Sequence, residues 1–148
     1  MKKSLFYGIF LTTLLIINSC STVDSVLNTG IVECKVNGAA WKSTIITTFY
    51  QTSTSTLAAA STNSSSIGIK FSKAATVGTY SLAIDTNAFI ATYLDATQKA
   101  FVATTGVVQI TEVDADGKLS GTFYLTCKDV SLTTVSITEG KFTKVVKK

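Results

Sequence analysis

The sequence predicts an all-β domain, a single antiparallel meander of about ten short strands that forms a β-sandwich or a partly closed β-barrel. Apolar and polar residues alternate with a period of two from Ile31 onward, and Thr, Ser, Val, Ile and aromatic residues dominate these runs. Turn-forming residues separate the runs at intervals of about 8–12 residues, and no segment has helical periodicity. Short connections of this kind favour antiparallel neighbours.

The first hairpin is predicted from the pair Asn37-Gly38, which follows the alternating residues 31–36. Both residues tolerate the positive φ angles of a type I′ turn, so this pair is a strong hairpin signal. The returning strand is predicted over residues 40–50. The following segment, residues 51–66, is rich in Ser, Thr and Ala, contains no Pro or Gly, and keeps strand-like spacing.

The later strands follow from the same alternation and from further turn signals. Asp114-Ala115-Asp116-Gly117 is a second strong hairpin turn, with Gly117 suited to a left-handed position. A turn is also expected at Glu139-Gly140. The predicted strands after residue 50 are residues 56–61, 67–71, 80–84, 88–94, 99–104, 108–113, 119–128, 133–138 and 141–146.

The N-terminal residues predict export and lipid attachment. Lys2 and Lys3 precede an apolar run from Leu5 to Ile17, which is shorter than the roughly 20 residues that a membrane-spanning helix needs. Ile17-Asn18-Ser19-Cys20 resembles the lipobox of bacterial lipoproteins, in which the cysteine is diacylated and becomes the mature N-terminus. The alternative is an ordinary signal peptide that is cleaved near a cysteine.

The domain organisation follows from this lipobox. Residues 1–19 are expected to be a signal peptide, residues 20–30 the lipidated Cys20 and a tether, and residues 31–148 the β-domain. The expected location is the outer membrane, with the periplasmic face favoured and cell-surface display left open. The membrane is therefore the first expected partner, through the lipid.

Composition limits the function further. Loss of Lys2 and Lys3 leaves 11 of the 13 lysines against nine acidic residues, so the mature chain carries little net charge. The chain contains no Arg, which argues against nucleic-acid binding. It also contains no His, which excludes catalysis by an imidazole and zinc sites with imidazole ligands. No cofactor, metal or catalytic residue is predicted, and a monomer is expected.

Cys34 and Cys127 form an even pair once Cys20 carries lipid. In an oxidising compartment they are predicted to form a disulfide, which would join the first hairpin to a late strand. The alternative is two buried thiols, because free Cys behaves as a small hydrophobic residue.

Asp114 and Asp116 are at alternate positions, as in the opening of a calcium loop. A complete loop would need further oxygen ligands, whereas Leu119-Ser120-Gly121 follows instead. Asp and Gly are also the residues that a hairpin turn requires, because Asp side chains accept hydrogen bonds from the backbone of the turn. The turn interpretation is therefore preferred.

Two aromatic residues are the candidates for ligand contact. An amphipathic ring exposed on a sheet can stack on a sugar or another apolar ligand. Trp41, directly after the first hairpin, is the first candidate, and Tyr50 is the second. The alternative for both is packing in the core.

Five short segments carry a resemblance to a known family. They are Cys34-x-Val36-Asn37-Gly38-x-x-Trp41, Gly78-Thr79-Tyr80, Gly106-x-Val108-x-Ile110-Thr111, Leu119-Ser120-Gly121-Thr122-Phe123 and Ile137-Thr138-Glu139-Gly140-Lys141-Phe142. These segments are similar to those of a group of small, uncharacterised lipoproteins found mainly in Bacteroidota. The resemblance spans residues 31–146 and implies an all-β envelope domain on a lipid anchor, with no established activity that could assign functional residues.

The expected function is non-catalytic binding of a glycan, lipid or protein partner. One form of this hypothesis places the ligand in an internal cavity lined by Phe71, Phe89, Phe101 or Phe123. A second form is a structural or interaction protein that docks another envelope protein through a strand edge or a flat patch. A glycan hydrolase is less favoured, because it requires two carboxylates facing each other in a cleft.

Overall fold

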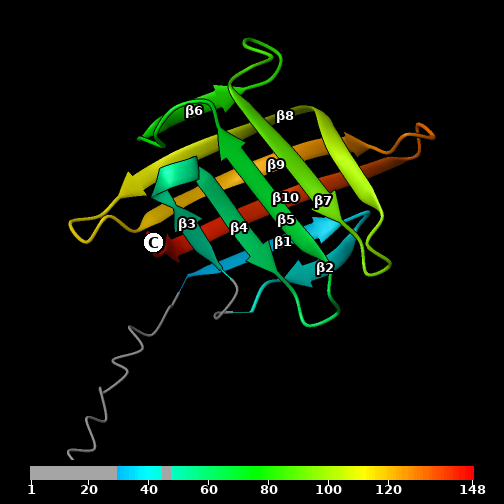
Figure 1. The fold of residues 1–148 in the computed structure, drawn as a ribbon, viewed down its shortest axis with the longest axis horizontal. Coiled ribbons are helices and arrows are strands. Elements are labelled where there is room, and N and C mark those ends of the chain that lie inside the picture. The colour runs from blue at the N-terminus through cyan, green and yellow to red at the C-terminus, as the bar shows by residue number, and fades with distance from the viewer. Residues whose placement is uncertain (1–29, 45–47) are drawn as a thin grey trace, which may run out of the picture.

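The computed structural model describes residues 30–44 and 48–148, and it confirms the all-β prediction. Ten strands form one antiparallel sheet that curls into a half-barrel (Figure 1), and a single 3₁₀ turn, η2 (Thr52–Thr54), is the helical element of the described residues. The strands are β1 (Ile31–Val36), β2 (Ala39–Lys42), β3 (Phe49–Gln51), β4 (Thr56–Ala60), β5 (Ser66–Phe71), β6 (Gly78–Ser81), β7 (Phe89–Leu94), β8 (Ala100–Val113), β9 (Leu119–Lys128) and β10 (Thr134–Val145).

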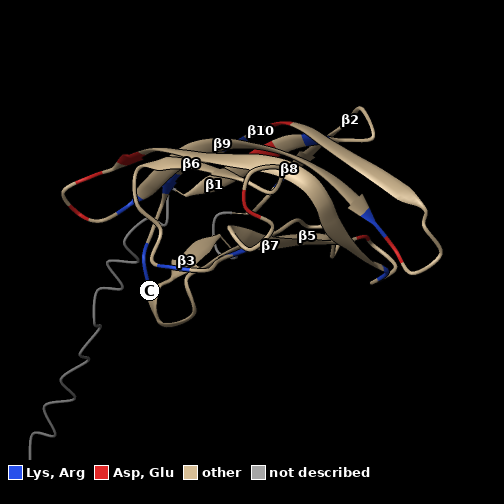
Figure 2. Ribbon diagram, turned by 90° about the horizontal axis from the view of Figure 1, so that it is seen from above, with Lys and Arg blue, Asp and Glu red and all other residues tan. Residues whose placement is uncertain are grey.

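The strand order explains the curled shape. Neighbouring strands follow the order β2-β1-β10-β9-β8-β7-β5-β4-β3, while β6 pairs with the second half of β8. Figure 2 shows the sheet from above as two layers, with β9 and β10 in one layer and β5 and β7 in the other. The sheet therefore folds over on itself between β9 and β7, and its two inner faces meet.

The core lies between these two layers and is filled by aromatic and aliphatic side chains. Phe71, Phe89, Phe101 and Phe123 all belong to it, with 2%, 2%, 4% and 3% of their surfaces exposed. Phe123 packs against Phe142 with a ring separation of 6.4 Å. The four phenylalanines thus pack within the core, which gives no support to the internal-cavity form of the binding hypothesis.

One predicted turn and one predicted strand break are instead internal features of long strands. Glu139-Gly140 lies within β10, and the predicted strands 99–104 and 108–113 are one continuous strand, β8. Glu139 has φ of 52°, and the pairing with β1 shifts register here, so this pair forms a bulge rather than a turn. A Cβ on Gly140 would lie 2.5 Å from the Phe123 carbonyl oxygen, so only glycine allows β9 and β10 to approach this closely.

The predicted strand over residues 40–50 is also corrected. The structure divides it into β2 and β3, which lie at opposite ends of the strand order. The chain leaves β2 at Ser43, whose Oγ accepts a hydrogen bond from the Val32 N–H at 2.8 Å. The Thr44 N–H then donates to the Ala60 carbonyl of β4 at 2.8 Å. This crossing connects the two ends of the sheet.

Candidate functional site

The β3 edge of the sheet is closed by the last residues of the chain. The Tyr50 N–H donates to the Val146 carbonyl at 2.9 Å, and the Lys148 N–H donates to the Tyr50 carbonyl at 2.8 Å. The Thr52 N–H donates to the Lys148 carbonyl at 3.0 Å. The Tyr50 side chain is 1% exposed, and its hydroxyl accepts a hydrogen bond from the Ala75 N–H at 3.0 Å. The backbone groups of β3 are therefore paired on both sides.

The β6 edge is open. In an antiparallel pair, hydrogen-bonded and non-hydrogen-bonded residue pairs alternate. The Leu82 N–H donates to the Gly106 carbonyl at 3.0 Å, so Tyr80 is the next residue that bonds to β8. Thr79 and Ser81 must then direct their backbone groups away from β8. Among the described residues, neither the N–H and carbonyl of Thr79 nor the N–H of Ser81 has a hydrogen-bond partner.

One hollow lies along this open edge and adjoins a second hollow beside the ends of β5 and β7; together we call them the β6 groove. The first has a volume of about 240 Å³ and contains the edge residues of β6; the second has a volume of about 250 Å³ and shares Ser72 with the first. The first hollow is lined by Ser72, Lys73, Thr79, Tyr80, Ser81, Ile84, Asp85 and Ala88. The second is lined by Lys70, Phe71, Ser72, Asn87, Phe89 and Ile90.

The groove lies between β6 and the end of the pair formed by β5 and β7. The Ser81 carbonyl accepts hydrogen bonds from the Ile84 N–H at 3.2 Å and the Asp85 N–H at 2.9 Å, which ends β6 in a tight turn. On the other side, the Ser72 N–H donates to the Ala88 carbonyl at 3.3 Å and continues the pairing of β5 with β7. Figure 1 shows β6 at the margin of the sheet, apart from these two strands.

Tyr80 lines the first hollow of the groove and holds the neighbouring loop in place. Its ring packs edge-on against Phe71 with a centroid separation of 5.0 Å. Its hydroxyl donates to the Thr76 carbonyl at 2.9 Å and accepts from the Thr76 N–H at 3.0 Å. The loop between β5 and β6 is therefore held against the edge strand.

Apolar side chains are concentrated around this groove. Val77, Ile84 and Ile90 are 61%, 90% and 61% exposed, and they are three of the seven large apolar side chains exposed in the described part of the chain. Ile84 lines the first hollow and Ile90 lines the second. A rim of this kind is favourable for a partner that buries apolar surface.

The aromatic residues predicted to contact a ligand are buried in the structure. Trp41 is 6% exposed, and its Nε1–H donates to Ser65 Oγ at 2.6 Å, which satisfies the polar end of the indole. Tyr50 is buried beneath the closed β3 edge. The structure therefore brings neither ring to a surface where a ligand could stack on it, and the two do not form one site.

Tyr124 is the tyrosine that is exposed on the outer face of the sheet, with 56% of its surface accessible. It lines an open hollow of about 360 Å³ beside the bulge of β10, together with Glu139 and Lys141. The alternation of β9 could have identified it, because Phe123 and Leu125 face the core on either side of it.

The predicted disulfide between Cys34 and Cys127 is wrong in this structure. Both are buried free thiols, on β1 and β9. β10 lies between these strands, and the two cysteines are out of register across it: Cys127 pairs with Val135, whereas the neighbours of Cys34 pair with Lys141 and Thr138. The two Cα atoms are therefore farther apart than two strand spacings, about 9–10 Å, whereas a disulfide requires about 4.4–6.8 Å. Burial raises the pKa of Cys34 to about 12 and that of Cys127 to about 11. Both thiols thus stay protonated at neutral pH.

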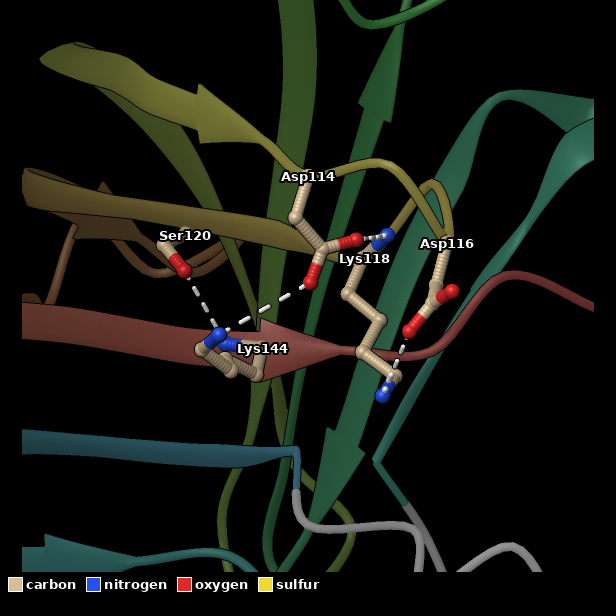
Figure 3. A network of polar contacts seen from close by, with 5 residues as sticks. All are labelled: Asp114, Asp116, Lys118, Ser120 and Lys144. Carbon is tan, nitrogen blue, oxygen red and sulfur yellow. Dashed lines mark hydrogen bonds and ion pairs between the residues drawn. The ribbon is translucent and has the colours of Figure 1, made fainter.

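The segment from Asp114 to Lys118 has the geometry of a hairpin turn (Figure 3). The Asp114 carboxylate accepts a hydrogen bond from the Lys118 N–H at 2.8 Å and lies 3.8 Å from Lys144 Nζ. Asp116 instead pairs with Lys118 Nζ at 3.4 Å. The two carboxylates are used within the turn and its neighbours, and the described residues contain no group of three or more potential metal ligands.

Most of the remaining carboxylates of the described residues are held by lysines or by turns. Glu33 pairs with Lys42 at 2.6 Å, and Glu139 pairs with Lys35 at 2.7 Å. Asp129 forms an ion pair with Lys99. The hydrogen bond from Lys99 is the main reason why the pKa of Asp129 lies below its usual value.

These features define a small β-domain, with a filled core and an open strand edge beside an apolar-rimmed groove. The chain belongs to the family described as Domain of unknown function (DUF6252), whose model matches residues 28–146. The searches of curated proteins and of solved structures found no match. No helix within the described residues is long and apolar enough to cross a membrane.

Proposed function

We propose that this chain is a lipoprotein of the bacterial outer membrane, anchored through Cys20, whose β-domain binds a partner without catalysing a reaction. Lys2, Lys3, the apolar run and the lipobox-like Ile17-Asn18-Ser19-Cys20 support export and lipidation. Cys20 lies outside the described residues. The resemblance to small lipoproteins of Bacteroidota supports the same assignment.

The open β6 edge with its groove is the observation that carries the binding function. Aromatic rings pack together inside the sheet, so an interior ligand site has no support, whereas the edge offers unpaired backbone groups and exposed apolar side chains. This favours the interaction form of the hypothesis, in which the domain docks another envelope component. Asp85 is the one carboxylate that lines the groove, whereas a glycan hydrolase uses two.

The position of the groove in the fold is compatible with the proposed lipid anchor. Residues 21–30 form a segment of ten residues that would reach roughly 35 Å if fully extended. Ile31 pairs with Thr143 near the end of β10, and β6 pairs with the half of β8 that leads to the same end of the sheet. A tether of this length would hold the groove within reach of other proteins at the membrane.

Replacement of Cys20 by Ala tests the anchor. We expect Cys20→Ala to move the protein from the outer-membrane fraction of a sucrose gradient to the soluble fraction, because the lipid is the proposed attachment. Thr22→Ala is the matched control and should remain with the membrane. If Cys20→Ala still sediments with membranes after a high-salt wash, the lipid-anchor assignment is wrong.

A further inference from the structure

We infer that the free edge of β6 recognises an extended peptide segment, which joins the sheet as an additional strand and places its side chains in the β6 groove. This inference rests on the proposed binding function and specifies its ligand class. The partner is a stretch of polypeptide with apolar residues at alternate positions, in a flexible terminus or loop of another envelope protein.

The backbone groups of the edge define this ligand class. Thr79 offers an N–H and a carbonyl, and Ser81 offers an N–H, all on the side away from β8. Residues i and i+2 of a strand present their backbone groups to the same side, at a spacing of about 6.6 Å. An extended peptide has the same repeat and supplies the complementary carbonyl and N–H groups. Its main chain thus satisfies several edge groups at once.

The groove suits the side chains of such a peptide. Phe71, Phe89 and Ile90 line the second hollow, and Ile84 lines the first. The two phenylalanines are buried, whereas the two isoleucines are exposed. Because alternate side chains of a strand point to the same face, two adjoining hollows can receive residues i and i+2 of one peptide. Apolar side chains at those positions would bury the exposed isoleucines.

Three charged residues of the groove are available to the partner. Lys73 and Asp85 line the first hollow and Lys70 lines the second, and none of them forms an ion pair with another described residue. They could pair with charges that flank the apolar positions of the peptide. Charges at the rim of an interface set orientation and specificity more than affinity.

The other edge strand of the sheet, β2, lacks these features. Its pairing with β1 leaves Ala40 and Lys42 directed outward, so it also has a free edge. Lys42 is on that edge and pairs with Glu33, and a lysine at an edge protects against strand addition. The two hollows of the β6 groove contain no residue of β2. The recognition function is therefore assigned to β6 alone.

A proline substitution at the edge tests the inference. Thr79→Pro removes one edge donor while leaving the pairing of β6 with β8 intact, because the Thr79 N–H points away from β8. Thr79→Ala removes the side chain but keeps the N–H and is the matched control. The full chain is reconstituted into lipid nanodiscs and screened with a displayed library of random heptapeptides.

We expect enriched peptides to bind the wild type and Thr79→Ala alike and to bind Thr79→Pro about tenfold more weakly. In the wild type, bound peptide should also slow amide hydrogen exchange at Thr79 and Ser81, a readout that does not depend on any variant folding. Far-ultraviolet circular dichroism verifies that Thr79→Pro is folded.

Three results would overturn the inference. If enriched peptides bind Thr79→Pro as tightly as wild type and leave the Thr79 and Ser81 amides unprotected, the binding function survives but the site is elsewhere. If the library yields no binder, the ligand is not a peptide strand, and the Cys20→Ala experiment still decides the anchor separately. If sedimentation shows a dimer that Thr79→Pro abolishes, the edge pairs with a second copy of the chain.

Discussion

The β3 edge and the β6 edge differ in whether their outer backbone groups have hydrogen-bond partners. Both lie where a strand could lack a neighbour, yet β3 is covered by the C-terminal residues 146–148 and β6 is not. Exposed edges invite unwanted pairing, so proteins normally cover or charge them. The last three residues cover the β3 edge, whereas the β6 edge stays free beside a groove, and the proposed contact is therefore assigned to β6.

The difference has a physical origin in the local pairing. β5 and β7 remain paired up to Phe71 and Phe89, so neither is available to β6. The turn after Ser81 then carries the chain directly to β7, without a segment that returns along β6. The closed edge therefore contributes hydrogen bonds that stabilise the sheet, whereas the open edge keeps backbone groups without partners.

Truncation of Tyr50 should have the largest effect. Tyr50→Ala removes a ring that is 1% exposed, together with the acceptor for the Ala75 N–H, and should lower the free energy of unfolding by about 3–5 kcal/mol. Urea denaturation monitored by circular dichroism measures the change. Tyr124→Ala is the control, because this exposed ring should cost about 0.5 kcal/mol or less. Equal losses for the two variants would contradict the burial of Tyr50 beneath the closed edge.

Removal of residues 146–148 should open the β3 edge. The deletion eliminates three backbone hydrogen bonds, and at about 0.5–1.5 kcal/mol for each bond the loss should be about 1.5–4.5 kcal/mol. Lys148→Ala keeps the backbone and should cost much less, since only the contact of its ammonium with Phe49 is lost. If the deletion and Lys148→Ala have the same midpoint in urea, the C-terminal residues do not close the sheet.

Prolines at neighbouring positions of β6 should distinguish the side of the strand that bonds to β8 from its free side. Tyr80→Pro, compared with Tyr80→Ala, should lose about 1–3 kcal/mol, because it leaves the buried carbonyl of Val108 without its donor. Thr79→Pro, compared with Thr79→Ala, should change the free energy of unfolding by about 0.5 kcal/mol. Both comparisons use urea denaturation. The reverse order would mean that Thr79, not Tyr80, bonds to β8.

Local features of the fold could be predicted from the sequence because they depend on neighbouring residues. The Asn37-Gly38 and Asp114–Gly117 turns, and the strand–turn–strand within residues 56–71, are where the patterns indicate. The pairing of β3 with the C-terminus could not be predicted, because it joins residues about 100 positions apart and has no local signal. Glycine at position 140 suggested a turn, although it is required by close strand contact.

The candidate site was less accessible to prediction for a related reason. Alternation shows which residues share a face, and it correctly separates Tyr124 from Phe123, but it does not show which faces or edges find partners. The polar ends of Trp41 and Tyr50 are satisfied by Ser65 and Ala75, which are distant in sequence, so both rings can be buried. The β6 edge is open because β8 is its one neighbouring strand among the described residues, and no residue type in the sequence signals that a second neighbour is missing.

Amide hydrogen exchange of the unliganded protein tests the central claim most directly, because it reports the bonding of each backbone N–H. The account predicts that Thr79 and Ser81 exchange rapidly while Tyr80 and Leu82, between and beside them, are protected. Tyr50 and Thr52 of the closed edge should be protected as well. Protection of Thr79 and Ser81 in the free monomer, or rapid exchange at Tyr50 and Thr52, would contradict the distinction between a closed edge and an open one.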